Sequence, residues 1–402
     1  MNALMEPKQH NYPDPEAPVS PIFSSHSCNL KKQPAPSNSI LALKHKIYVS
    51  SGRAAICLAL EDAGIKEGDS VLVPAFHCES MISPVKWCKA TPVFYRVKDD
   101  TSLDLNDIRR HITPDIKAII ATHYFGFLQD LNELREVCDQ NNIVLIEDCA
   151  HAFYGNRHGH NVGEWGDYAV ASSMKFFPVY DGGILASNRH PLTAVNTTAP
   201  PKLFGIKSII NTLERSVRFQ RLGLLGKLFN VALNLKGWLW NALKSLSSNN
   251  HGEISGPGSS DGGYALDENW IHKESTSASR SIILHSDFEL NQTIRRKNYQ
   301  VLESAIKDLP GVKPLYEHLP ENVVPLIFPA YIEDPSTFFP LMKNAGIPIW
   351  RFGEYLDPQI DDSICANSMK LSAHVFQFPC HQELTQRELD WMLNTIEKIL
   401  RH

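Results

Sequence analysis

The sequence predicts an α/β protein with a large, mostly parallel, doubly wound domain and a smaller C-terminal α+β domain. Apolar runs of strand length alternate with helix-length segments between about residues 45 and 190. That rhythm stops over residues 201–264, and a second alternation begins near residue 285. Strands that alternate with helices are typical of parallel sheets covered by helices. We therefore expect a large domain over 41–284 and a small domain over 285–402.

The expected elements follow one another closely along both domains, and their lengths and apolar spacing decide between helix and strand. In the large domain, strand-like runs occupy residues 46–49, 70–73, 92–95, 118–121, 143–146, 168–171 and 184–186, and helix-length segments occupy 53–64, 79–89, 104–111 and 129–141. In the small domain, helices are expected over 290–309, 335–344 and 385–400, and strands over 323–328 and 347–350.

Two segments lack apolar periodicity. Residues 1–40 contain seven prolines, and residues 246–264 are rich in Ser, Asn and Gly. Such compositions are typical of extended or disordered chain. We expect a flexible N-terminal arm and a flexible loop or linker.

Residues 201–245 carry eight Lys and Arg residues against one acid, Glu214, so this segment has a net charge of +7 and the rest of the chain −12. Apolar residues fall three, four or seven apart along one helical face: Leu213, Val217, Leu224, Leu228, Val231, Leu235 and Trp238. A basic amphipathic helix can lie on an anionic membrane surface. It can equally form a helical hairpin that packs on its own domain or on a second subunit. Both interpretations are open.

The composition excludes several classes of protein. A formal net charge of −5 argues against a general nucleic-acid binder. The eight cysteines form no CxxC pair, and several lie in apolar runs, which favours free thiols in a reducing compartment. The N-terminus lacks the apolar core of a signal peptide, and no stretch approaches the roughly 18 apolar residues of a spanning helix. We therefore expect a cytoplasmic enzyme.

Polar residues of chemical interest follow the ends of the predicted strands. They are Gly52 and Arg53 after the first strand, His77 and Cys78 after the second, His123 after the fourth, Asp148 and His151 after the fifth, and Ser172, Ser173 and Lys175 after the sixth. In doubly wound sheets, ligands bind outside the carboxyl ends of the strands. We therefore expect these side chains to gather at one edge of the sheet.

Asp148 and Lys175 are the most informative of these residues. A lysine can bond the aldehyde of pyridoxal phosphate (PLP), and a carboxylate can keep the pyridine nitrogen of that cofactor protonated. The free N–H groups at the helix that begins with Gly52 and Arg53 form an anion site. A structural salt bridge between Asp148 and Lys175 is the alternative interpretation.

Several motifs resemble those of the DegT/DnrJ/EryC1/StrS family of PLP-dependent aminotransferases, which is known for aminating nucleotide-linked keto sugars. Ser-Gly-Arg-Ala-Ala at 51–55 resembles the family's Ser-Gly-Thr-Ala-Ala, and residues 68–74 resemble its Gly-Asp-Glu-Val-Ile-Val-Pro. Ile-Glu-Asp-Cys-Ala-His at 146–151 resembles its Ile-Glu-Asp-Ala-Ala-His signature. Lys175 precedes Gly182 and Gly183 at the spacing that the family uses.

The resemblance implies the PLP-dependent fold type I and a role for each matching residue. Lys175 would bond the cofactor and then move a proton, and Asp148 would pair with the pyridine nitrogen. Ala150 would pack on a ring face, and His151 would hydrogen-bond the phenolic oxygen. The phosphate would be held by Gly52, Arg53 and either Ser172 or Ser173. An aromatic side chain over the ring would come from Phe76 or His77.

Two further residues are candidates for substrate contacts. Arg351 could grip the carboxylate of an amino-acid donor, or form an ordinary ion pair. His381 lies in a turn that resembles one of the family and could approach the site. His151, His158 and His160 do not have metal-ligand spacing, so no metal site is expected.

The resemblance implies transfer of an amino group, from glutamate, to a keto group of a nucleotide-linked sugar in polysaccharide or glycan synthesis. It also implies a homodimer whose subunits complete each other's active sites. One alternative is PLP chemistry of another outcome, namely dehydration, elimination or transamination of a non-sugar substrate. Another alternative is a non-catalytic, membrane-associated protein of the same fold, with residues 201–245 as its membrane contact.

Overall fold

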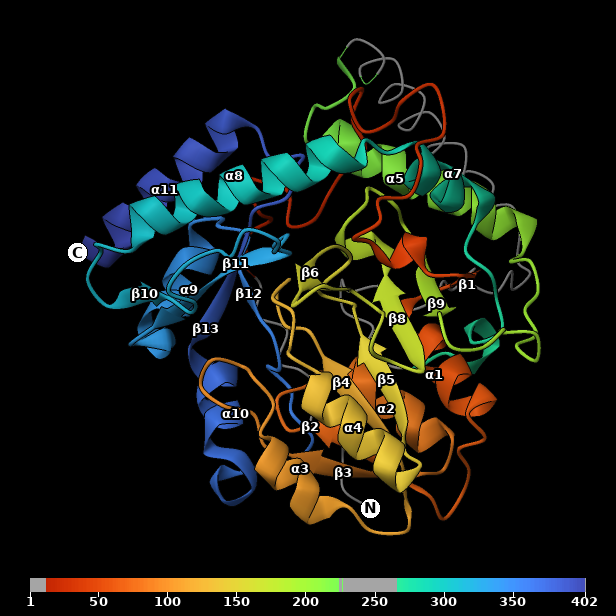
Figure 1. The fold of residues 1–402 in the computed structure, drawn as a ribbon. Helices are drawn as coiled ribbons and strands as arrows, with labels where there is room; N and C mark the ends of the chain where they lie inside the picture. Colours follow the sequence, from red (N-terminus) through yellow and green to blue (C-terminus); the bar gives the residue numbers. More distant parts are fainter. Residues whose placement is uncertain (1–11, 224–225, 227–265, 402) are drawn as a thin grey trace, which may run out of the picture.

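The computed structural model describes residues 12–223, 226 and 266–401 (Figure 1). The predicted flexible loop at 246–264 and most of 224–245 lie outside the described residues. None of the described helices has the length and apolar character needed to cross a lipid bilayer.

The large domain is built on a seven-stranded sheet of order β1-β9-β8-β5-β4-β2-β3. Its strands are β1 (His45–Val49), β2 (Ser70–Pro74), β3 (Thr91–Tyr95), β4 (Ile116–Thr122), β5 (Val144–Asp148), β8 (Tyr168–Ser172) and β9 (Gly183–Ser187). β9 is antiparallel to both of its neighbours, β1 and β8, whereas the pairs from β8 to β3 are parallel. The predicted, mostly parallel α/β fold is therefore confirmed.

The strands are buried because helices cover the sheet. Val71, Leu72, Ile119 and Ile120 are each fully buried. Runs of apolar residues without polar alternation are typical of parallel strands that are covered on both faces. The helices of this domain are α1 (Gly52–Asp62), α2 (Glu79–Trp87), α3 (Leu105–His111), α4 (Asn132–Asn141), α5 (Lys202–Arg218) and α7 (Ser277–His285).

The small domain has a four-stranded antiparallel sheet of order β10-β11-β13-β12. Its elements are α8 (Phe288–Ile306), β10 (Val312–Pro314), β11 (Ile327–Ile332), α9 (Pro335–Asn344), β12 (Trp350–Arg351), α10 (Asp362–His374), β13 (Val375–Pro379) and α11 (Gln386–Arg401). Tyr299, Phe328, Phe376 and Met392 belong to a separate core of this domain. In Figure 1, α8 extends from this domain to α5 and α7.

Several small-domain boundaries differ from the predicted ones. The strand predicted at 323–328 begins only at Ile327, because Val323 closes a turn with Pro320 and Leu326 N donates to the carbonyl of Phe125 in the large domain. The strand predicted at 347–350 is reduced to β12, and α10 and β13 were not predicted. A short hairpin of β6 (Asn156–Arg157) and β7 (His160–Asn161) was also not predicted.

The N-terminal arm is extended, but its described part is not a free leader. Ala17 and Ile22 are buried, and backbone hydrogen bonds join Glu16 to Gly346 and Asn29 to His285. The described part of the arm therefore packs against both domains, and the expected flexibility stays a prediction. The prolines remove backbone donors, and the arm forms hydrogen bonds with existing loops instead of forming its own helix or strand.

Candidate active site

The polar residues that follow the strands do gather at the carboxyl edge of the large sheet. β4, β5 and β8 are neighbours, so the loops that follow them lie side by side. Lys175 ends the short helical turn η2 (Ser173–Lys175), which directly follows β8. The charge of Lys175 acts on Asp148, on His151 and on the thiol of Cys78, which places these groups around one amine.

Asp148 is 4% exposed and lies at the end of β5. Its Oδ1 accepts a hydrogen bond of 2.9 Å from the backbone N–H of Ala150. Burial raises the pKa of Asp148, and the Ala150 N–H and the charge of Lys175 oppose that rise. The carboxylate is thus held in a fixed orientation at a site that favours a cationic or N–H partner.

Lys175 is partly exposed, and its pKa is lowered by burial. Nearby Cys78 and Asp148 raise that pKa, and the charge of Arg53 lowers it. In the part of the chain that the structure describes, no ion pair joins the Lys175 amine to Asp148. The two groups therefore lie near each other without forming the salt bridge of the alternative interpretation.

His151 is buried between two aromatic rings. Its imidazole stacks on Phe125 with centroids 5.7 Å apart and meets the edge of Phe352 at 4.8 Å. Burial and the charge of Lys175 hold the pKa of His151 well below its usual value, so the ring is neutral. The backbone N–H of Phe125 donates to Nδ1 over 3.5 Å. Nε2 therefore carries the proton and is the donor nitrogen.

An anion cradle lies where α1 begins. The side chain of Ser51 caps α1 by accepting a hydrogen bond from Ala54 N, and the first N–H groups of the helix follow. A Cβ atom on Gly52 would lie 3.3 Å from Cβ of Ser172, so the cradle is closed on its other side by Ser172. Ser173 is fully buried, and its Oγ has no hydrogen-bond partner in the described part of the chain. Ser172, not Ser173, is thus the serine beside the helix N-terminus.

Cys78 lies at the expected edge of the sheet, although no role was predicted for it. Burial raises the pKa of its thiol, the nearby charge of Lys175 opposes that rise, and the charge of Asp148 adds to it. The side chain is partly exposed. The signal for it in the sequence is its position shortly after the second predicted strand.

His77 is not available to a cofactor, which corrects the prediction made from the sequence. The ring is fully buried and stacks on Phe94. Its Nδ1 lies 3.0 Å from the carbonyl of Pro74, and its Nε2 accepts a hydrogen bond from Asp357 N over 3.0 Å. Both nitrogens are therefore used to join the end of β2 to a loop of the small domain.

Phe76 is likewise fully buried in an aromatic cluster. Its ring stacks on Tyr124 and meets Phe352 edge to face. It is therefore committed to the core, and the expectation of an aromatic ring from Phe76 or His77 over the cofactor is not met by either side chain.

Arg351 and His381 do not join the Lys175 cluster, so both substrate predictions are corrected. Arg351 donates to Glu354 over 2.7 Å and stacks on Phe339, beside a surface cavity of about 520 Å³. His381 is 2% exposed, and its Nε2 forms a hydrogen bond with the carbonyl oxygen of Pro18. Each side chain already has partners within the small domain and the N-terminal arm.

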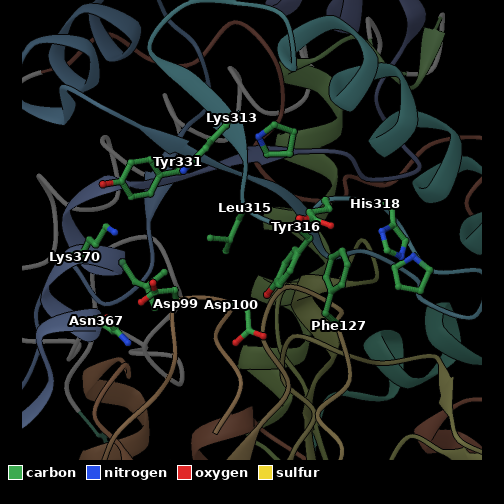
Figure 2. A pocket seen from close by; sticks show the side chains of 14 residues that line it. Asp99, Asp100, Phe127, Lys313, Leu315, Tyr316, His318, Tyr331, Asn367 and Lys370 are labelled. Atoms are coloured by element: carbon green, nitrogen blue, oxygen red, sulfur yellow. The ribbon is translucent and has the colours of Figure 1, made fainter. Parts of the chain in front are cut away.

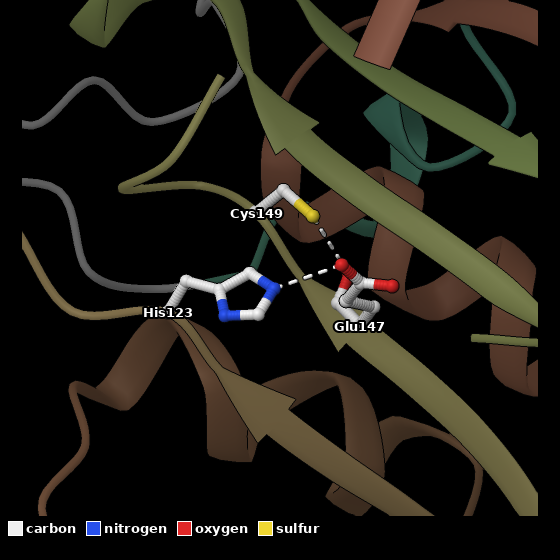
Figure 3. Close-up of side chains that lie close together, drawn as sticks. All are labelled: His123, Glu147 and Cys149. Atoms are coloured by element: carbon white, nitrogen blue, oxygen red, sulfur yellow. Dashed lines mark hydrogen bonds and ion pairs between the residues drawn. The ribbon is translucent and has the colours of Figure 1, made fainter. Parts of the chain in front are cut away.

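His123, Glu147 and Cys149 form a buried cluster beside the site (Figure 3). His123 Nε2 lies 2.8 Å from Glu147 Oε1, and His123 Nδ1 accepts from the backbone N–H of Gln129. The two carboxylate oxygens also accept backbone N–H groups from residues 163, 165 and 166. These hydrogen bonds use both imidazole nitrogens and tie the 163–166 loop to β5, which is a structural role.

A cavity of about 530 Å³ lies between the two domains (Figure 2). Tyr331 stands beside the ammonium groups of Lys313 and Lys370, and Tyr316 stacks on Phe127 on one side of the cavity. None of the residues predicted for the site lines this cavity. The Lys175 cluster is therefore a separate place.

Comparison with known proteins gives one family. Residues 38–208 match the profile of the DegT/DnrJ/EryC1/StrS aminotransferase family. The GDP-perosamine synthase of Vibrio cholerae is 35% identical over 151 residues, which are 37% of this chain and 41% of that protein. The L-glutamine:2-deoxy-scyllo-inosose aminotransferase of Streptomyces kanamyceticus is 33% identical over 225 residues, which are 50% of this chain and 52% of that protein. The chain thus spans about half the length of these relatives or less.

Solved structures extend the likeness of fold over most of the chain. The NtdA structure from Bacillus subtilis, with bound cofactor PMP, superposes with a TM-score of 0.60 at 18% identity. The superposition covers 90% of this chain and 74% of that one. At this identity the likeness concerns the fold, and it includes the small domain.

Proposed function

Since this chain belongs to the DegT/DnrJ/EryC1/StrS aminotransferase family through residues 38–208, we propose that it is a PLP-dependent aminotransferase. The observation that carries the proposal is the Lys175 cluster. It combines an amine of lowered pKa, a buried carboxylate that has no ion pair among the described residues, and a helix N-terminus beside a serine.

The residues present fit PLP at each of its polar groups. The N-terminus of α1, with Gly52, Arg53 and Ser172, suits the phosphate, and Gly52 leaves room where a Cβ would lie 3.3 Å from Cβ of Ser172. Asp148 suits a protonated pyridine nitrogen, because its buried carboxylate gains from a cationic partner. His151 Nε2 suits the phenolic oxygen as a donor, and Ala150 leaves room over the ring.

When bound, PLP supplies an electron sink that stabilises negative charge on the carbon next to the transferred nitrogen. Lys175 holds the aldehyde end of the cofactor and is the base that moves the proton at that carbon. Burial lowers the pKa of its amine and so increases the neutral fraction that can accept a proton near pH 7. Asp148 keeps the ring nitrogen protonated, and the neutral His151 orients the ring without adding charge.

We propose that the acceptor is a keto group of a nucleotide-linked sugar and that the donor is glutamate. The names of the relatives support amination of sugars and related cyclitols, and one of them names L-glutamine as donor. Glutamine and a non-sugar acceptor are therefore the specific alternatives within the same chemistry.

The amino donor can be identified without the acceptor. Purified protein should be yellow with PLP, borohydride should fix the cofactor on Lys175, and a donor should convert the bound PLP into PMP. Glutamate and glutamine are compared with a panel of amino acids, and K175A is the control that loses the fixation. A wild-type protein that stays colourless after PLP is added would refute the proposal. A coloured protein that converts with no donor would point to elimination chemistry instead.

We also propose a cytoplasmic homodimer, because Lys175 and its neighbours lie at an edge that a second subunit can complete. Size-exclusion chromatography with light scattering measures the assembly. Mixing K175A with a variant that is defective on a partner-facing residue would restore activity only if each site combines two subunits.

Contact with an anionic membrane surface is a second proposal that α5 favours. The buried residues of this helix include Ser208, Thr212 and Ser216, whereas Leu203 and Ile206 are 63% and 55% exposed. The polar face points inward because Asp181 accepts a hydrogen bond from Ser208 Oγ over 2.8 Å. A helix with an outward apolar face, in a segment of net charge +7, suits a lipid surface with anionic headgroups.

The membrane proposal is tested by flotation with phosphatidylcholine vesicles, with and without phosphatidylglycerol. Wild-type protein should float only with the anionic vesicles, and the triple variant L203S/I206S/I209S should not float. L341S is the matched control, because Leu341 is 48% exposed on α9, away from α5. If the triple variant instead changes the oligomeric state and leaves flotation unaltered, α5 is a subunit interface and the membrane proposal fails.

A further inference from the structure

Arg295 of α8 is a fully buried cation. Within the described residues it forms no ion pair with a carboxylate, and burial lowers its pKa from 12.5 to about 10. It therefore remains charged at neutral pH. A buried charge is unfavourable unless hydrogen bonds satisfy it, so the partners of this guanidinium are informative.

The guanidinium donates mainly to backbone carbonyls at the Lys175 turn and at the segment before β11. Nη2 donates to the carbonyl of Lys175 over 3.1 Å and to that of Phe176 over 3.4 Å. Nη1 donates to the carbonyls of Pro325 and Leu326 over 3.2 and 3.0 Å. The guanidinium also stacks on the Phe176 ring at 4.6 Å.

Gln382 completes this arrangement from the end of β13. Its Oε1 accepts from Arg295 Nε over 2.8 Å, and its Nε2 donates to the carbonyl of Phe176 over 2.9 Å. Both side chains come from the small domain, whereas Lys175 and Phe176 belong to the large domain. The carbonyls at the end of a helical turn have no partner inside it, so these two side chains supply the missing donors.

The segment that shares Arg295 also supports the other side of the site. Leu326 N donates to the carbonyl of Phe125 over 2.8 Å, and Phe125 is the ring on which His151 stacks. Gly126 lies so close to this segment that a Cβ there would be 2.5 Å from the carbonyl of Val324. Arg295 thus connects the backbone of Lys175 with the loop that positions His151.

We infer that Arg295 and Gln382 are positioning residues for Lys175, and that the small domain fixes the direction of the lysine through the carbonyls of its turn. The inference rests on the proposed PLP function. It does not require the charge of Arg295 to reach the amine, since Arg53, not Arg295, is the cation that lowers the pKa of Lys175. The effect is on geometry.

The test compares R295M, R295K and Q382L with R296M as the matched control. Arg296 follows Arg295 on α8 and also donates to backbone carbonyls, those of Pro320 and Val323, but it does not contact the Lys175 turn. The first readout is the rate at which apoprotein develops the visible band of Lys175-bound PLP. The second is the pH midpoint of that band, which reports the environment of the lysine and does not depend on activity.

We expect R295M and R295K to form the band about tenfold more slowly or worse, since a displacement near 1 Å can cost about 100-fold in rate. Q382L should have a smaller effect, and R296M should match wild type. The pH midpoint should shift in R295M, R295K and Q382L but not in R296M. If R295M does not fold, R295K and Q382L decide, because both keep most of the buried volume.

A wild-type rate and pH midpoint in folded R295K and Q382L would overturn the inference and leave the PLP function intact. An equal loss in R296M would also overturn it, because the effect would then come from general destabilisation of α8. Wild-type protein that takes up no PLP would refute the proposed function itself, which is a distinguishable result.

Discussion

Gly183 gives the sharpest test of the phosphate cradle. It begins β9 and lies opposite Val49 of β1 and Ser172 of β8, so it separates the two chain segments that form the cradle. A Cβ atom at Gly183 would lie 2.3 Å from the carbonyl carbon and oxygen of Ser51 and 2.7 Å from Gly52 N. Ordinary contacts begin at 3.4 Å, so the backbone at the start of α1 would have to move by about 1 Å.

Gly183→Ala should therefore weaken PLP binding about 100-fold, because a shift of roughly 1 Å can remove that much from an aligned site. The overpacking should also lower the free energy of unfolding by about 1–3 kcal/mol. PLP titration followed by visible absorbance measures the first effect, and urea unfolding of the apoprotein measures the second.

Gly205→Ala is the matched control for Gly183→Ala. Gly205 lies within α5, and a Cβ there would meet nothing within 4 Å. Replacing a helical glycine by alanine should stabilise the protein by about 0.5–1 kcal/mol and leave PLP affinity unchanged. Wild-type affinity for PLP in Gly183→Ala, together with the expected loss of stability, would refute the placement of the phosphate at the start of α1.

Three other predictions follow from the site and its surroundings. Asp148→Asn should keep the PLP–lysine bond but slow conversion by the amino donor about 100-fold or more, measured by stopped-flow absorbance, because an amide cannot hold the ring nitrogen protonated. Maleimide should label Cys78 in apoprotein and not after PLP is bound, as read by peptide mass spectrometry; labelling of the partly exposed Cys28 and Cys88 should not change, and equal labelling of Cys78 would place it outside the site. Burial lowers the pKa of His77 to about 4 and of His381 to about 3, so each ring binds a proton on unfolding between that value and about 6.5. Stability should therefore fall with decreasing pH in this range by up to about 1.4 kcal/mol per unit and per ring, and an unchanged slope in His381→Asn would contradict the role given to that residue.

The part of the site that belongs to single strand ends was predictable from the sequence. Asp148 ends β5, and His151 and Lys175 lie three residues beyond the ends of β5 and β8, so assigning the strand also assigns the edge at which the side chain emerges. The sequence could not decide between Ser172 and Ser173. Adjacent residues at the end of a strand point to opposite faces, and only the position of α1 shows which face holds the cradle.

The histidine predictions show why residue type and place at a strand end are not sufficient. His77 and His381 follow strands of the two sheets. Each ring, however, forms a hydrogen bond with the backbone of a segment that is distant in the sequence. A buried imidazole has two nitrogens to satisfy, and nearby carbonyls and N–H groups do so as well as a ligand. The pattern of residues contains no information about those distant partners.

Arg295 and Gln382 were not predicted as site residues, because their partners are also distant in the sequence. Unlike His77 and His381, these two residues do contact the site. Arg295 occupies the buried face of a predicted helix, where a sequence pattern favours an apolar residue. A charged residue at such a position conflicts with the pattern, and the conflict is resolved only by the carbonyls of Lys175, Phe176, Pro325 and Leu326. The position of the small domain therefore matters for the chemistry of the large one. A change in the packing of α8 against the Lys175 turn should alter the lysine before it alters the carboxylate, because Asp148 is held by its own loop.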